Sequence, residues 1–178
     1  MYVPRTDNVR QVAFVPARQS CENLGIAAAV QSVLATQKVD LPQSTLVMKL
    51  SGTDTCGPFL GGPAEAAKAV SGDYTLDNGR RIHVEALFED TFVDPGRLIR
   101  AISEDRPFLL FWKHHAFMVI GLKYVEGIHS SGLHIYDIRE MRLMDPFGSA
   151  EQSPTVFEKR QESLREVSGI VEVTATSP

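Results

Sequence analysis

The chain has 178 residues, 43% of them hydrophobic, and a formal net charge of −4 at pH 7. This length suits a single domain, and the apolar content excludes a disordered chain, which buries too little surface to offset its conformational entropy. The 18 lysines and arginines are scattered along the chain, whereas binding to nucleic-acid phosphates needs them clustered. We therefore expect one domain over residues 1–178 and no nucleic-acid partner.

No segment approaches the ~20 consecutive apolar residues that cross a bilayer, so we expect no membrane partner. Residues 1–7 lack the apolar core of a secretory signal peptide, which predicts a protein that is cytoplasmic where it is made or is exported without such a signal. The two cysteines, Cys21 and Cys56, form one bridge or stay as thiols. They lack the Cys/His spacing of zinc sites, so we expect no metal.

Helix signals dominate the first half of the chain. Residues 24–37 are apolar on almost every side, the pattern of a buried helix, with Asn23, Ser20 or Glu22 as its cap. Pro42 and Pro63 each open a further helix, because proline fits the first helical turn. The other elements expected here are a short strand within residues 10–18 that leads into a loop at Pro16, a hairpin of 74–76 with 81–84, and a helix over 95–103.

Strand signals dominate the second half, where short apolar runs alternate with turns bearing glycine and serine. The expected strands are residues 107–112, 116–124, 133–138, 141–144 and 169–174, with a helix over 157–166. Helices followed by strands indicate an α+β fold. We expect two lobes, a helical one over about 10–105 and a sheet lobe over about 106–178.

Three short motifs contain the residue types used in thiol hydrolysis. Such chemistry needs a thiolate, favoured at a helix N-terminus, and a histidine that shares its proton. Residues 19–29 read Gln-Ser-Cys-Glu-Asn-Leu-Gly-Ile-Ala-Ala-Ala and open the expected buried helix. Residues 114–121 read His-His-Ala-Phe-Met-Val-Ile-Gly, and residues 143–147 read Leu-Met-Asp-Pro-Phe.

In this order, the motifs resemble those of papain-like cysteine proteases, in particular the compact bacterial branch of AvrRpt2-type and C39-like peptidases, over residues 10–150. The resemblance implies the papain-like two-lobed fold, with an antiparallel sheet in the second lobe and no cofactor. It assigns the nucleophile to position 25, proton transfer to His115, orientation of the imidazole to Asp145, and the oxyanion hole to Gln19.

The chain departs from the family at the nucleophile, because Gly25 stands where the family has cysteine. Glycine cannot attack a carbonyl, and near the start of a helix it costs ~1 kcal/mol relative to alanine. The glycine is explained either by a natural pseudoenzyme or by a substitution introduced to inactivate a protease. The presence of Gln19, His115 and Asp145 favours the second explanation.

Neighbouring residues are secondary candidates. Cys21 is an alternative nucleophile, although the adjacent Glu22 would oppose formation of its thiolate. Asp137 is a second candidate for orienting the catalytic imidazole. We expect His114 at the surface on the opposite side of its strand from His115, and Trp112 in the core.

The resemblance predicts a cysteine peptidase that cleaves protein or peptide substrates through a Cys-His-Asp triad, present here in an inactive form because of Gly25. By analogy it also predicts a bacterial effector or toxin domain, secreted into a target cell by a system that needs no signal peptide, with a neutralising immunity protein as partner. Two alternatives stay open. One is a natural pseudoprotease that binds a protein or peptide in its cleft, and the other is a deamidase or transglutaminase using the same triad.

Overall fold

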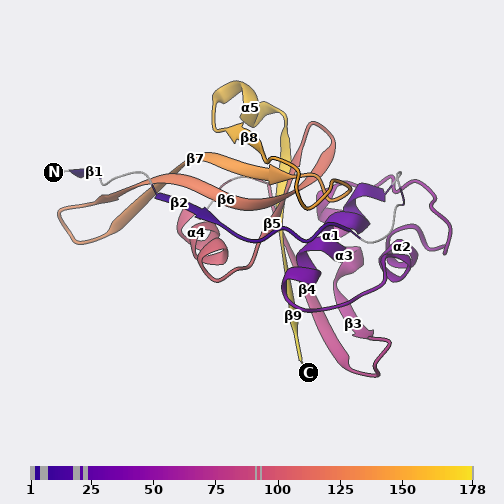
Figure 1. Cartoon of the computed structure of the whole chain (residues 1–178). Coiled ribbons are helices and arrows are strands. Elements are labelled where there is room, and N and C mark those ends of the chain that lie inside the picture. The colour runs from indigo at the N-terminus through magenta and orange to yellow at the C-terminus, as the bar shows by residue number, and fades with distance from the viewer. Residues whose placement is uncertain are drawn as a thin grey trace.

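The computed structural model describes residues 3–4, 8–17, 21, 24–90, 92 and 94–177. The fold is α+β, as predicted (Figure 1). The helices are α1 (Gly25–Thr36), α2 (Gln43–Ser51), α3 (Pro63–Val70), α4 (Pro95–Ser103) and α5 (Gln161–Arg165). The strands are β1 (Val3–Pro4), β2 (Asn8–Gln11), β3 (Gly72–Thr75), β4 (Arg81–Glu89), β5 (Phe108–Trp112), β6 (His115–Ile128), β7 (His134–Met144), β8 (Thr155–Glu158) and β9 (Val167–Thr176).

These strands form one antiparallel sheet. Its order is β3-β4-β9-β5-β6-β7-β8, and both β1 and β2 pair with β6 beyond the part that pairs with β5. Gly121 of β6 lies opposite Gln11 of β2, and a β-carbon at this glycine would collide with the carbonyl oxygen of Arg10. The glycine therefore allows the close approach of the two strands.

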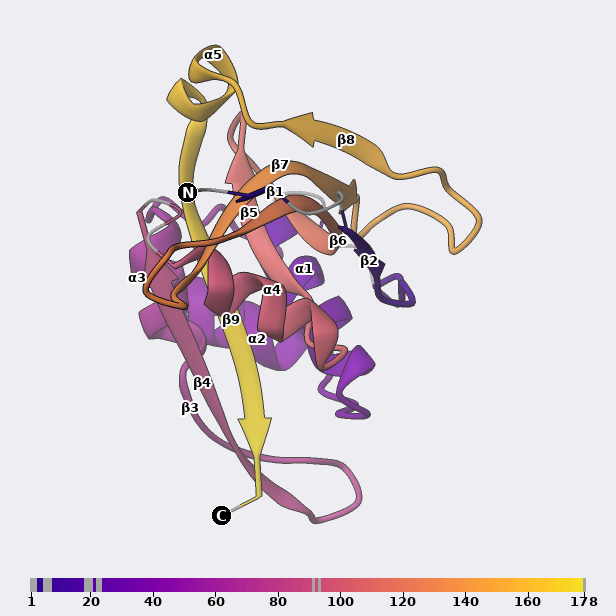
Figure 2. The same cartoon turned by 90° about the vertical axis from the view of Figure 1, so that its left-hand side faces the viewer.

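The central strand β5 is buried on both faces, which explains its uninterrupted apolar sequence. Leu109 and Phe111 belong to one hydrophobic cluster, with residues of α1, α2 and α3, whereas Phe108 and Leu110 belong to a second cluster with residues of α4. Alternate side chains of a strand face opposite sides of a sheet, so α1–α3 and α4 cover opposite faces. Figure 1 shows this separation, and in Figure 2 α4 lies in front with α1 and α2 behind it.

Helix α1 is buried along most of its length, as its sequence predicts. Its three alanines, Ala27, Ala28 and Ala29, are each 0% exposed, and such small side chains let neighbouring elements pack closely. The buried amide of Gln31 is satisfied, because it donates to the carbonyl of Leu41 at 3.3 Å. The helix begins after Leu24, which makes no side-chain cap bond, and the predicted caps at positions 20, 22 and 23 lie outside the described residues.

The predicted start signals of α2 and α3 and the predicted range of α4 are confirmed. Pro42 immediately precedes α2, and Pro63 is the first residue of α3. Helix α4 is capped by Asp94, whose carboxylate accepts the backbone N–H of Arg97 at 3.0 Å.

Two strand predictions and one helix prediction are corrected. The separate strands at 133–138 and 141–144 are one continuous strand, β7, because residues 139–140 stay within its antiparallel pairing with β6. The helix predicted over 157–166 is wrong in its first part, since Phe157 lies in β8, opposite Met141 of β7, and only residues 161–165 are helical. In the predicted strand from residue 10, regular pairing ends at Gln11.

The sheet crosses the predicted lobe boundary near residue 105. β4 from the first half pairs with β9 from the second, over seven residues from Glu89↔Ile170 to His83↔Thr176. Both halves of the chain therefore contribute strands to the sheet.

None of the helices in the described parts of the chain is long and apolar enough to cross a membrane.

Candidate functional site

A cleft of about 900 Å³ lies where the start of α1 meets the ends of several strands. Its lining comes from residues 24–26 at the start of α1, 59 and 61–63 before and at the start of α3, 111 and 114–117 around the β5–β6 turn, 145–147 after β7, and 168 of β9. Segments distant in sequence therefore meet in one place.

Three of the four predicted site residues line this cleft: Gly25, His115 and Asp145. The fourth, Gln19, lies outside the described residues. The structure thus brings together the nucleophile position, the histidine and the acidic residue that the motifs single out.

Position 25 has room for a side chain. A β-carbon on Gly25 would have Phe147 Cε2 as its nearest neighbour, at 3.7 Å, which is an ordinary van der Waals distance. Unlike Gly52, with a φ of 73°, Gly25 is not among the glycines with positive φ. Neither the backbone nor the surroundings therefore require glycine at the position that the family fills with cysteine.

A tight turn sets the position of His115. Trp112 and His115 are paired residues of β5 and β6, and the two residues between them, Lys113 and His114, have φ angles of 51° and 63°. Two central residues with positive φ match the twist of a two-residue hairpin, usually made with asparagine and glycine. The turn makes His115 the first residue of β6.

The pairing register also fixes the face from which His115 meets the cleft. Its partner Trp112 packs against the second hydrophobic cluster, as does Phe117, whose ring centroid lies 6.2 Å from that of His115. Ala116 and Met118, in contrast, belong to the cluster with α1. His115 therefore lies at the exposed end of the sheet, on the face opposite to α1.

His114 also borders the cleft. His114 is exposed, as expected. It lies in the turn and not in the strand, so its predicted position on the opposite side of the strand from His115 is wrong. The cleft is thus bordered by two neighbouring imidazoles.

Asp145 sits in a well-fixed turn after β7. Its Oδ1 accepts the backbone N–H of Phe147 at 2.9 Å, and its carbonyl oxygen accepts the N–H of Gly148 at 2.9 Å and the side-chain amide of Gln152 at 2.8 Å. The carbonyl of Pro146 accepts the N–H of Ala17 at 2.8 Å. One oxygen of the Asp145 carboxylate is thus used to place Phe147 beside the start of α1.

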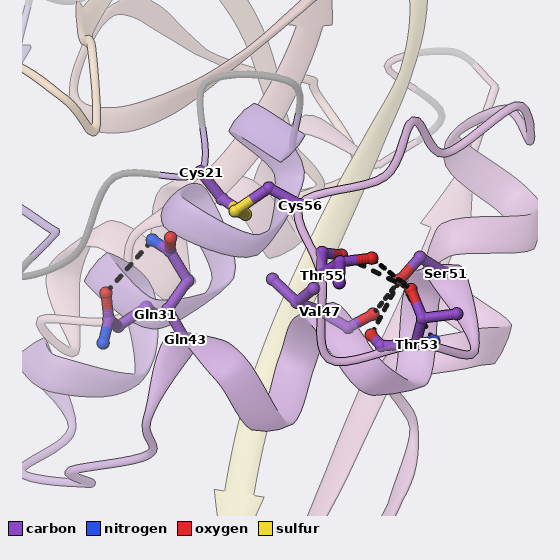
Figure 3. The surroundings of a disulfide bond; sticks show 8 residues. All are labelled: Cys21, Gln31, Gln43, Val47, Ser51, Thr53, Thr55 and Cys56. Atoms are coloured by element: carbon purple, nitrogen blue, oxygen red, sulfur yellow. Dashed lines mark hydrogen bonds between the residues drawn. A yellow bond between two sulfur atoms is a disulfide. The ribbon is translucent and has the colours of Figure 1, made fainter.

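The alternative nucleophile Cys21 is joined to Cys56 in a disulfide, with a Cα–Cα distance of 5.4 Å (Figure 3). Cys21 is only 4% exposed and, in this form, carries no thiol. Among the described lining residues, Ser168 is the only one with a hydroxyl group, and its Oγ donates to the carbonyl of Phe111 at 3.5 Å. The described part of the cleft therefore offers imidazoles and a carboxylate but no thiol.

The two remaining secondary candidates belong elsewhere. Asp137 accepts from Lys159 Nζ at 2.7 Å and pairs with Arg139 at 3.0 Å, away from the cleft lining. Trp112 is partly buried and packs edge-on against Phe157 of the second hydrophobic cluster, with ring centroids 5.3 Å apart, and it does not line the cleft. No set of three or more potential ligands able to hold a metal is present in the part of the chain that the structure describes.

Aromatic wall residues were not predicted as functional. Phe59, Phe117 and Phe147 all line the cleft. Phe147 was visible as the aromatic residue after Asp-Pro, but Phe59 lies in a glycine-rich loop without regular periodicity, so no local pattern marks it.

Comparisons with known protein families, with curated proteins and with solved structures found no match for this chain. The geometry of the cleft therefore carries the functional argument.

Proposed function

We propose that this protein is a two-lobed, papain-like peptide-binding protein whose cleft has lost its nucleophile. The observation that carries the proposal is the convergence of Gly25, His115 and Asp145 on one cleft without a thiol among its described residues. In this interpretation α1–α3 form one lobe, and the sheet, which includes β3 and β4 from the first half of the chain, forms the other.

The surroundings of the cleft suit an extended peptide. Phe59, Phe117 and Phe147 supply apolar and aromatic walls, which bind side chains by burying them. The first N–H groups of a helix have no acceptor within the helix, and α1 begins at Gly25 without a side-chain cap. A peptide carbonyl placed there would meet the first N–H groups of α1 and the positive end of the helix dipole.

The experiment that tests binding uses an array of overlapping peptides from β-casein, probed with the protein and two variants. Phe147 is 40% exposed and lines the cleft, whereas Leu133 is 64% exposed at the distant end of the β6–β7 hairpin. We expect Phe147→Ala to weaken the bound spots at least about fivefold, a loss of about 1 kcal/mol, and Leu133→Ala to leave them unchanged. Equal effects of the two variants would contradict a peptide site in the cleft.

A second candidate function, active cysteine peptidase chemistry, is favoured by the room for a β-carbon at position 25. In that case a thiol at this position attacks a carbonyl, an imidazole takes its proton, and Asp145 orients the imidazole. Incubation of the Gly25→Cys variant with casein, followed by mass spectrometry, separates new termini from deamidated or cross-linked products. Delivery into a target cell and a neutralising partner stay predictions of the resemblance.

A further inference from the structure

The disulfide joins two walls of the cleft. Cys21 precedes the start of α1, and its carbonyl accepts the N–H of Leu24, a cleft residue, at 2.7 Å. Cys56 lies in the loop over residues 52–62, which also contains the cleft residues Phe59, Gly61 and Gly62. The bond therefore ties the α1 wall to the loop wall (Figure 3).

The loop over residues 52–62 has local hydrogen bonds at both ends. At its start, the N–H of Gly52 donates to Met48 at 2.9 Å, and the hydroxyls of Ser51, Thr53 and Thr55 bond among themselves. At its end, the N–H of Gly62 donates to Glu65 Oε2 at 3.0 Å. These hydrogen bonds connect the loop to α2 and α3. The disulfide, in contrast, connects it covalently to the α1 wall.

The middle of the loop presents apolar groups at the cleft. Phe59 packs against the hydrophobic cluster around α1, whereas Leu60 is 94% exposed. After reduction the packing of Phe59 against this cluster remains, but the covalent link between the loop and the α1 wall is lost. The position of this wall is therefore sensitive to the state of the disulfide.

The two cysteine residues differ in exposure. Cys56 is exposed and Cys21 is buried, so an attacking thiolate meets Cys56 first. With a dithiol reductant, the first thiolate forms a mixed disulfide with Cys56, and Cys21 leaves as a thiolate that takes a proton. The second thiol of the reductant then displaces Cys56, so that two electrons pass to the protein and the reductant is oxidised to its own disulfide.

We propose that the Cys21–Cys56 disulfide is a redox-controlled anchor of the cleft. In the oxidised form the loop over residues 52–62 is held against the start of α1, and the cleft keeps its shape. Reduction by a dithiol releases the loop, and affinity for a peptide falls. The peptide part rests on the proposed function, but release of the loop does not.

Hydrogen–deuterium exchange tests the anchor directly. The oxidised protein is compared with protein reduced by dithiothreitol and with the double variant Cys21→Ala, Cys56→Ser, which keeps the buried position apolar and the exposed one polar. We expect amides of residues 57–62 and 24–27 to exchange at least about tenfold faster in both disulfide-free forms, and those of β6 and β7 to be unchanged. Unchanged exchange at 57–62, or faster exchange throughout the sheet, would contradict the proposal. It would mean that the disulfide does not specifically hold this loop against α1.

A casein-derived peptide bound by the oxidised protein then tests the functional consequence, by fluorescence polarisation with the peptide labelled. We expect its dissociation constant to rise at least about fivefold on reduction. Equal affinity in both states would overturn the redox inference and leave the proposed function standing. If no peptide binds the oxidised protein, the proposed function fails, while the exchange experiment still decides whether the loop is anchored.

Discussion

Phe147 Cε2 lies 3.7 Å from the point where a β-carbon on residue 25 would stand. This relationship links the Asp-Pro-Phe turn after β7 to the first residue of α1. Phe147 is held there by the hydrogen bond from its N–H to Asp145, so the turn that carries the acidic residue also shapes the space in front of position 25. The same contact shows that a small side chain would fit at this position.

The first prediction concerns a thiol at that position. Gly25→Cys should fold, and its new thiol should have a pKa below the ordinary value of about 8.5, because it stands at a helix N-terminus in a cleft that two imidazoles also line. The measurement is the rate of alkylation by iodoacetamide as a function of pH. A thiol that titrates at or above the ordinary pKa would remove the peptidase candidate.

Two matched variants in the Gly25→Cys background identify the working histidine. His114 and His115 both line the cleft, one from the turn and one from β6. If His115 is the base, His115→Ala raises the thiol pKa and His114→Ala does not. Because His115 lies on the face opposite to α1, the reverse result would assign the role to His114. Peptide mapping must show that Cys21 and Cys56 remain paired.

Local signals located the helices because each depends on a few neighbouring residues. The proline at the start of α3 and the alanines of α1 act on their own segments. β7 and β8 depend instead on distant partners. Phe157 has a helical neighbourhood in sequence, but its burial against Trp112 and its pairing opposite Met141 determine a strand.

The candidate site was predictable only where motifs mark it. His115 and Asp145 stand beside a recognisable strand and turn, and both reach the cleft. The disulfide could not be predicted, since the spacing of Cys21 and Cys56 in the sequence does not fix the distance between their Cα atoms. The turn at Lys113 and His114 lacks the glycine that is typical of positive φ. No sequence signal therefore predicts that His114 lines the cleft.

The second prediction concerns the structural role of Asp145. Asp145→Ala removes the acceptor for the N–H of Phe147 and should lower the free energy of unfolding by about 1 kcal/mol. Asp145→Asn keeps an acceptor oxygen and should lose less than half of that. Urea denaturation measures both values. Equal losses would mean that this hydrogen bond does not hold the turn.

The third prediction is a loss of stability at alkaline pH. Burial raises the pKa of Tyr74 from 10.0 to about 12, and its hydroxyl donates to the carbonyl of Val70 at 2.6 Å. The folded state therefore holds this proton more tightly than the unfolded chain. The resulting stabilisation is complete below about pH 10 and is lost as the pH rises towards 12, by about 2–3 kcal/mol.

Tyr74→Phe provides the control for this pH dependence. It should cost about 1 kcal/mol at pH 7, through the lost hydrogen bond, and should reduce the drop in the free energy of unfolding between pH 10 and 12. Denaturant unfolding at a series of pH values provides the comparison. A drop of the same size in the variant would assign the alkaline transition to other groups.

The fourth prediction concerns the ion-pair cluster that joins α4 to the sheet. Arg97 donates from Nε to Glu172 Oε1 at 2.7 Å and also pairs with Glu89, and the two carboxylate side chains are only 12% and 18% exposed. Arg97→Met would leave two poorly hydrated carboxylates beside each other. We expect a fall in the free energy of unfolding of about 3 kcal/mol, because removing one partner leaves uncompensated charge.

Two controls separate buried charge from lost packing in this cluster. Arg106 pairs with Glu104 at 2.5 Å, but these side chains are 35% and 52% exposed, so Arg106→Met should cost less than about 1 kcal/mol. Adding Glu89→Gln and Glu172→Gln to Arg97→Met removes the stranded charges and should recover more than half of the lost stability. If the triple variant is no more stable than Arg97→Met, the stability lost in Arg97→Met does not come from two uncompensated carboxylates.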